Sequence, residues 1–186
     1  MLKFDKETLI KALTDLGEIL FLSGKMAEIA VFGGSALMLM FDYRQATRDV
    51  DAVFFSDKTE LNSAIITIAE KYNFDNDWIN DGVKGFVNES VHDTLKIFRS
   101  FPDEDHPGLR IFLPSAEYIL SMKCLAMRTE IGSSDISDIK ILLKKCSIDS
   151  PEELFDLIAM FYPKAHIPPK TQFGILELFE ELRSTQ

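Results

Sequence analysis

Cysteine, histidine and tryptophan are scarce in this chain, and long hydrophobic runs are missing from it. Its 186 residues include two cysteines, three histidines and one tryptophan. Cys124 and Cys146 have neither the spacing of a metal-ligand pair nor the number needed for a disulfide framework, so we expect reduced thiols in a cytoplasmic protein. No apolar stretch approaches membrane-spanning length and no signal-like pattern opens the sequence, so we expect no membrane partner.

Positive charge is also in short supply. The chain has 20 Lys and Arg against 30 Asp and Glu, a formal net charge of −10 at pH 7. Because non-specific binding to nucleic acid requires basic side chains that neutralise phosphates, we expect no non-specific DNA binding. Binding to tRNA would require scattered cations to gather on one face. Those cations are Arg44, Arg48, Lys84, Lys123, Arg128, Lys144 and Lys145.

The residues that are present can form a buried core, since 46% are hydrophobic and 27% are charged. Hydrophobic periodicity and end signals predict helices over 6–22, 35–41, 57–72, 116–130, 135–145, 151–161 and 171–182. Strands are predicted over 27–32, 49–55, 94–98 and 109–113. We therefore expect an α/β (α+β) fold. A small mixed sheet of about four to five strands, flanked by helices, would occupy residues 1–114, and a helical half packed on it would occupy residues 115–186.

The segment 73–87 is the least regular part of the chain. Its stretch from Asp77 to Phe86 combines the single tryptophan with polar residues and glycines. Because a solvated linker would not normally contain a tryptophan, we expect a loop or short helix in which Trp78 is anchored in the core.

A glycine turn, Gly33-Gly34-Ser35, separates a predicted strand from a predicted helix. Glycines let a phosphate approach the main chain, and the N-terminus of a helix carries partial positive charge. Ser35 can cap the helix or offer its hydroxyl to the same anion. On its own, such a turn is as compatible with a ligand-free connection as with a phosphate site.

Two carboxylates, Asp49 and Asp51, lie two residues apart on the next predicted strand. Their side chains should leave one face roughly 7 Å apart, while Val50 faces the core. Aspartate is depleted in strands, and two like charges on one face lower stability unless something neutralises them. Arg44 and Arg48 are one source of neutralising charge. A divalent cation that bridges to substrate phosphates is the better explanation, because Arg48 would lie on the opposite face of the strand.

This combination of Gly-Gly-Ser, a helix and Asp-x-Asp resembles the polymerase-beta-like nucleotidyltransferase superfamily. The resemblance is closer to its AbiE-type, toxin-like branch and to related small nucleotidyltransferases. In that branch a strand with Arg-x-Thr-x-Asp-x-Asp is followed by a lysine and then by two aspartates in Asp-x-x-Asp spacing. This chain has Arg44 one residue earlier than that arginine. Here residues 45–51 supply the strand, and Lys123 precedes Asp135 and Asp138.

The resemblance implies a metal-dependent transfer of a nucleoside monophosphate. An acceptor hydroxyl on an RNA end such as tRNA, on a protein or on a small molecule would attack the α-phosphorus, and pyrophosphate would leave. Asp49 and Asp51 would hold Mg²⁺ or Mn²⁺. The nucleoside triphosphate would be bound by Gly33, Gly34, Ser35, Thr47 and Arg48. The toxin-like branch also implies an antitoxin as a partner.

The same resemblance implies roles for Lys123 and the later aspartates, and each has a structural alternative. Lys123 would steady the triphosphate charge, and Asp135 or Asp138 would activate or orient the acceptor. Alternatively, Lys123 extends from a packed helix to solvent. Asp135 would then be the N-cap of its helix, with Asp138 in the favourable first turn.

Other members of the superfamily carry a third acidic residue on a neighbouring strand, and this chain departs from that pattern. Lys96 stands in the predicted strand where an acidic residue is expected. Asp93, just before that strand, is one substitute and Asp81 a second, but the toxin-like alternative, in which Asp135 or Asp138 serves instead, is favoured over both. The alternative to an active transferase is therefore a catalytically weak or inactive module of the same fold that binds a nucleotide or a protein partner.

Overall fold

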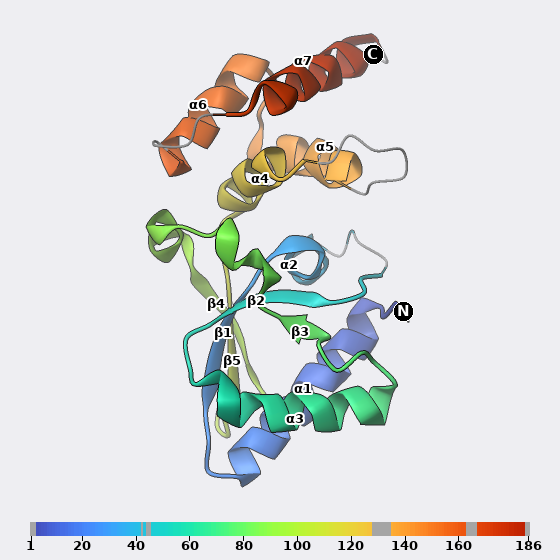
Figure 1. Ribbon diagram of the computed structural model, residues 1–186, viewed down its shortest axis with the longest axis vertical. Coiled ribbons are helices and arrows are strands. Elements are labelled where there is room, and N and C mark those ends of the chain that lie inside the picture. The colour runs from blue at the N-terminus through green and yellow to red at the C-terminus, as the bar shows by residue number, and fades with distance from the viewer. Residues whose placement is uncertain (1–2, 42, 44–45, 128–134, 163–166, 185–186) are drawn as a thin grey trace. The chain divides into compact units, whose positions relative to one another are not determined.

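The structure, a computed structural model, describes residues 3–41, 43, 46–127, 135–162 and 167–184 (Figure 1). The chain forms two compact units. The first comprises Met1–Gly85 and Leu95–Pro114, and the second comprises Phe86–Thr94 and Ser115–Gln186. The second unit therefore takes up 86–94 in addition to the C-terminal helices.

A five-stranded mixed sheet forms the first unit, which confirms the predicted fold class. Its strands are β1 (Ala27–Val31), β2 (Val50–Phe54), β3 (Ile79–Asn80), β4 (Lys96–Phe101) and β5 (Leu109–Leu113). They lie in the order β3-β2-β1-β5-β4. β1 runs antiparallel to β2 and parallel to β5, β2 runs parallel to β3, and β4 runs antiparallel to β5. Because β1 and β2 are antiparallel, the end of β1 lies beside the beginning of β2.

Three α-helices, α1 (Lys6–Leu22), α2 (Gly33–Phe41) and α3 (Lys58–Tyr72), belong to the first unit. Asp5 caps α1 and Asp57 caps α3, each accepting a main-chain N–H in the first turn. Figure 1 shows α1 and α3 together on one face of the sheet, where α1 packs against β4 and β5. Apolar side chains at helical spacing along α1, among them Leu9, Leu13 and Leu16, are buried there.

The two-residue strand β3 was not predicted, although the burial of Trp78 was. Trp78 is 1% exposed, and its indole N–H donates to the carbonyl of Ile65 at 3.1 Å. The Val50 N–H donates to the carbonyl of Trp78 at 2.6 Å. Anchoring Trp78 between α3 and β2 places the next two residues beside β2, with Asp51 in register with Asn80. A short 3₁₀ helix, η1 (Gly82–Gly85), follows.

The second unit is helical. It contains η2 (Glu89–Thr94), α4 (Ala116–Leu125), α5 (Asp135–Cys146), α6 (Pro151–Phe161) and α7 (Pro169–Ser184). Helix α4 ends at Leu125, short of the expected residue 130; residues 128–134 lie outside the described part of the chain. Within the described ranges, no helix combines the length and apolar character needed to cross a bilayer.

Both cysteines of the second unit are free thiols. Burial raises the pKa of the Cys124 thiol to about 12 and that of the Cys146 thiol to about 11. Because the thiolate is the reactive form, neither cysteine is an activated nucleophile at neutral pH.

The contact between α1 and β4 depends on a glycine and generates a stability prediction. A Cβ on Gly17 would collide with the main-chain carbonyl group of Phe101, whereas a Cβ on Gly85 would meet nothing within 4 Å. Because the Phe101 backbone cannot move cheaply, Gly17→Ala should lower the free energy of unfolding by about 1–3 kcal/mol. Gly85→Ala is the control and should change it by less than about 0.5 kcal/mol. Urea denaturation measures both, and equal stabilities of the two variants would contradict this packing.

Candidate functional site

The glycine turn meets Asp51 where β1 ends and β2 begins. The Phe32 N–H donates to the Asp51 carbonyl at 2.8 Å, which joins the two strands next to the turn. Gly33 has a φ of +61°, in the left-handed region that favours glycine. A Cβ on Gly33 would lie 2.5 Å from Asp51 Oδ2. Glycine is therefore required twice, for its backbone conformation and for the close approach of the carboxylate.

Ser35 holds the main chain of Asp49. Helix α2 begins at Gly33, so Ser35 lies inside its first turn and not at the expected cap position. The Ser35 side chain is almost completely buried, and its hydroxyl donates to the Asp49 carbonyl at 2.5 Å. The buried Thr47 hydroxyl donates to the same carbonyl at 3.1 Å. Hydrogen bonds from two hydroxyl groups to one carbonyl thus hold the main chain in place just before β2 begins.

The two carboxylates differ in exposure. Asp49 lies just before β2 and is exposed, whereas Asp51 lies within the strand and is half-buried. Val50 between them is buried, as the alternation of side chains along a strand requires. Arg48 lies exposed in the bend that precedes Asp49, and Arg44 is outside the described residues.

On its other side, Asp51 is bordered by β3 and the residues that follow it. Asn80 is the register partner of Asp51, and the Gly82 N–H donates to Asn80 Oδ1 at 2.9 Å. A Cβ on Gly82 would lie 2.9 Å from Asn80 Oδ1 and 4.0 Å from Asp51 Oδ1. The Asp51 carboxylate is therefore flanked by glycine on both sides. We call Gly33, Asp51, Asn80 and Gly82 the Asp51 cradle.

The donor set at the cradle fits a hard divalent cation. Among the described residues, no three His, Cys, Asp or Glu side chains gather into a group that could hold a metal. A closed zinc site needs such a group, whereas Mg²⁺ is typically bound by one or two carboxylates together with substrate phosphates and water. Asp49 and Asp51 are the carboxylates of this part of the sheet, and the missing Cβ atoms of Gly33 and Gly82 leave room for the Asp51 and Asn80 side-chain oxygens.

Asp81 is unsuited to be the third carboxylate. Its Oδ2 lies 2.8 Å from Lys84 Nζ and its Oδ1 lies 3.1 Å from Lys58 Nζ. These ammonium groups lower the pKa of Asp81 to about 2, which makes it a poor proton acceptor at neutral pH. The other residues considered, Asp93 and Lys96, lie in η2 of the second unit and at the start of edge strand β4.

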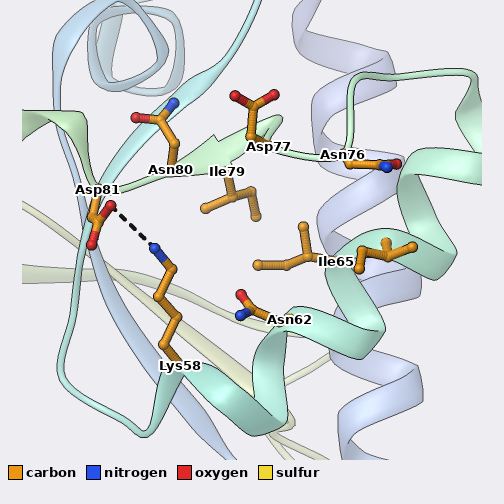
Figure 2. Close-up of a pocket in the computed structure, with 9 residues that line it drawn as sticks. Lys58, Asn62, Ile65, Asn76, Asp77, Ile79, Asn80 and Asp81 are labelled. Atoms are coloured by element: carbon orange, nitrogen blue, oxygen red, sulfur yellow. Dashed lines mark ion pairs between the residues drawn. The ribbon is translucent and has the colours of Figure 1, made fainter.

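A pocket of about 420 Å³ lies between α3 and β3 (Figure 2). In Figure 2 the Ile79 side chain points toward Ile65 on α3, while the Asn80 side chain points the opposite way. The ion pair of Lys58 and Asp81 lies at one end of the pocket. Both residues of β3, Ile79 and Asn80, line the pocket, although consecutive side chains of a strand alternate between faces.

In the second unit, Lys123, Asp135 and Asp138 form a group of their own. Lys123 Nζ lies 2.8 Å from Asp138 Oδ2 and 3.5 Å from Asp135 Oδ1. Lys123 is 8% exposed and Asp138 is 2% exposed, so Lys123 does not extend to solvent. Asp135 is the first residue of α5 and not its N-cap. This ion-paired group joins α4 to α5.

The comparison with protein families agrees with this geometry. A family model described as "Nucleotidyltransferase of unknown function (DUF6036)" matches residues 7–167. The chain belongs to this nucleotidyltransferase family. The match confirms the nucleotidyltransferase resemblance but does not extend to the AbiE-type branch.

Two further comparisons give little beyond the nucleotidyltransferase family. No curated protein matches the chain. Among solved structures, it is similar to an antigenic nucleotidyltransferase-like protein from Paracoccidioides brasiliensis, at 17% identity over 95% of each chain with a TM-score of 0.45. A likeness at that level says nothing about the activity of this chain.

The close approach of Gly33 to Asp51 in this nucleotidyltransferase can be tested against a matched glycine. Gly24 has a φ of +68°, but a Cβ there would meet nothing within 4 Å. Gly24→Ala should lower the free energy of unfolding by about 1–2 kcal/mol, the strain of a left-handed alanine. Gly33→Ala should lower it by more, because its Cβ also collides with Asp51. Thermal denaturation measures both losses, and equal losses would contradict the close approach.

The ion-paired group of the second unit predicts a large loss of stability when its cation is removed. Lys123→Met leaves the buried Asp138 carboxylate without this partner and should lower the free energy of unfolding by about 3–5 kcal/mol. The control is Lys140→Met. Lys140 pairs with Glu181 at 2.9 Å on the surface of the same unit, and such pairs contribute about 0–1 kcal/mol. Denaturation followed by helical circular dichroism separates the two variants, and similar losses would contradict a buried pair.

Proposed function

We propose that this protein is a metal-dependent nucleotidyltransferase that moves a nucleoside monophosphate from a nucleoside triphosphate to an acceptor hydroxyl. The observation that carries the proposal is the Asp51 cradle. A phosphate group would meet main-chain N–H groups at the start of α2, and the Asp51 carboxylate beside Gly33 suits a cation shared with that phosphate. Membership of a nucleotidyltransferase family supports the same reaction class.

Different residues of the first unit would bind the cation, bind the triphosphate and position the main chain. Asp49 and Asp51 would hold Mg²⁺ or Mn²⁺, which neutralises charge on the phosphates. Gly33 and Gly34 present the positive end of α2 to the triphosphate. Ser35 and Thr47 act through the Asp49 carbonyl, which they hold in place.

The transfer forms one bond and breaks another. A bond forms between the acceptor oxygen and the α-phosphorus, while the bond from that phosphorus to the bridging oxygen breaks. Pyrophosphate leaves with the electron pair, and the acceptor's proton passes to solvent. Positioning and charge neutralisation, and not covalent chemistry by the protein, therefore carry most of the catalysis.

The roles implied for the second unit stay predictions. Asp138 is buried and pairs closely with Lys123, so its contacts support a part in holding that lysine. Asp135 is farther from Lys123 and more exposed, which suits it better to orient an acceptor. The toxin role and its antitoxin likewise stay part of the proposal on the strength of the resemblance alone.

The acceptor is proposed to be an RNA end such as tRNA, a protein or a small molecule. Two of the cations that tRNA binding would require are already engaged. Lys123 is buried in an ion pair, and Lys84 pairs with Asp81. Lysines that are paired with carboxylates are less able to bind the phosphates of an extended RNA. A short RNA end needs fewer phosphate contacts and so remains a proposed acceptor.

A second function, nucleotide binding with little or no turnover, is favoured by Asn80. Its side chain lies in register with Asp51 on the strand beside it. A carboxamide does not take up a proton at neutral pH, so Asn80 cannot be the general base for the acceptor.

Replacement of the carboxylate pair tests the proposal directly. Asp49→Asn combined with Asp51→Asn should weaken magnesium-dependent binding of a nucleoside triphosphate by at least about 10-fold, because the cation loses both charged ligands. The control is Asp103→Asn combined with Asp105→Asn, which has the same spacing and charge change in the exposed loop between β4 and β5. Calorimetric titration measures the affinities, and unchanged binding in the first double variant would remove the site assignment.

The same proteins separate transfer from binding. They are incubated with each labelled nucleoside triphosphate, magnesium or manganese, and a mixture of cellular RNA and protein. Label that appears with the wild type and the control but not with the Asp49/Asp51 variant supports transfer. Binding without label supports the second function, and equal labelling by the Asp49/Asp51 variant contradicts the enzyme assignment.

A further inference from the structure

We propose that Asn80 supplies a third oxygen ligand to the cation held by Asp49 and Asp51, an inference that rests on the proposed function above. Asp51 has two neighbours across the sheet. On β1 its carbonyl accepts the N–H of the buried Phe32, and on β3 its register partner is Asn80. Of these two neighbours, only Asn80 has a polar side chain.

The side chain of Asn80 lies on the same face of the sheet as that of Asp51. Register partners on neighbouring strands point to the same side, and the preceding pair, Val50 and Ile79, is buried on the other face. Figure 2 shows the Asn80 side chain directed away from that of Ile79, although both residues line the α3 pocket.

Gly82 fixes which end of the Asn80 carboxamide carries the oxygen. The Gly82 N–H must meet an acceptor, so the atom 2.9 Å away is Oδ1. A carbonyl oxygen has two lone pairs, and this hydrogen bond uses one. Asn80 Oδ1 and Asp51 Oδ1 also border the same space, since both lie within 4.0 Å of the position that a Cβ on Gly82 would occupy. Two oxygens from adjacent strands thus converge at a glycine-lined opening.

A neutral oxygen at this place has a chemical consequence. Carboxylate, carbonyl and water oxygens suit Mg²⁺ and Mn²⁺, so the amide can complete a ligand set without adding a third negative charge. Asp49 and Asp51 together balance one divalent cation. The arrangement therefore favours binding of a single cation, with an affinity below that of a site with three carboxylates.

Manganese binding tests the role of Asn80 without reliance on turnover. Mn²⁺ is titrated into the full chain with a non-hydrolysable nucleoside triphosphate analogue, and free Mn²⁺ is followed by electron paramagnetic resonance. Asn80→Ala should raise the Kd for Mn²⁺ by about 5- to 10-fold, and Asn80→Asp should lower it by about 10-fold, because a charge replaces a dipole. Asn80→Asp retains an acceptor for the Gly82 N–H and so keeps the fold, which makes it decisive even if Asn80→Ala is unstable.

Asn62→Ala and Asn76→Ala are the matched controls, because both asparagines line the α3 pocket and are exposed. Both should bind Mn²⁺ as the wild type does. Wild-type affinity in Asn80→Ala, or no gain in Asn80→Asp, would overturn the inference. If affinity is lost in the Asp49/Asp51 variant but unaffected by either change at Asn80, only the role of Asn80 fails. A wild-type protein that binds no Mn²⁺ overturns both proposals.

Discussion

The antiparallel pairing of β1 with β2 is the constraint on which the candidate site depends. The chain leaves β1 through the glycine turn, runs along α2 and returns so that the beginning of β2 lies beside the end of β1. The hydrogen bond from the Phe32 N–H to the Asp51 carbonyl holds this register. A slip of one residue would turn Asp51 toward the core and Val50 outward. The burial of Val50 therefore directs Asp51 to the opposite face, next to Gly33.

The two units handle their acidic groups in different ways. In the second unit the chain provides its own cation, and Lys123 sits within ion-pair distance of Asp135 and Asp138. Removing such a pair from water costs free energy. Separating the two charges inside the protein would cost more, because one buried charge would lose its counter-charge. In the first unit the Asp51 carboxylate lies close to the main chain at Gly33 and near Gly82, where there is no Cβ. Glycine positions this carboxylate, whereas ion pairs position the group around Lys123.

Local signals in the sequence were enough for most elements and for half of the cradle. Helix α1 and helix α6 have the predicted bounds, because Asp5 and the capping box of Ser150 mark their starts. Gly33 and Asp51 could be predicted because a glycine turn and an Asp-x-Asp strand are short motifs. Asn80 could not, since two residues show no periodicity and β3 exists only because Trp78 is anchored to α3 and β2. The role of Ser35 was missed for a similar reason, as its acceptor lies 14 residues away on another element.

The contrast between Asn80 and Asp81 shows how one position along a strand separates two kinds of polar residue. Asn80 is the last residue of β3 and shares a face with Asp51, whereas Asp81 follows the strand and is held by Lys58 and Lys84. A carboxylate at position 80 would add a third negative charge beside Asp49 and Asp51. Lys58 and Lys84 would not neutralise that charge, because they pair with Asp81. The amide avoids that repulsion but gives up the ability to accept a proton. Under the proposed function, Asn80 would favour cation binding but could not deprotonate the acceptor, whose hydroxyl would lose its proton to water or to another base.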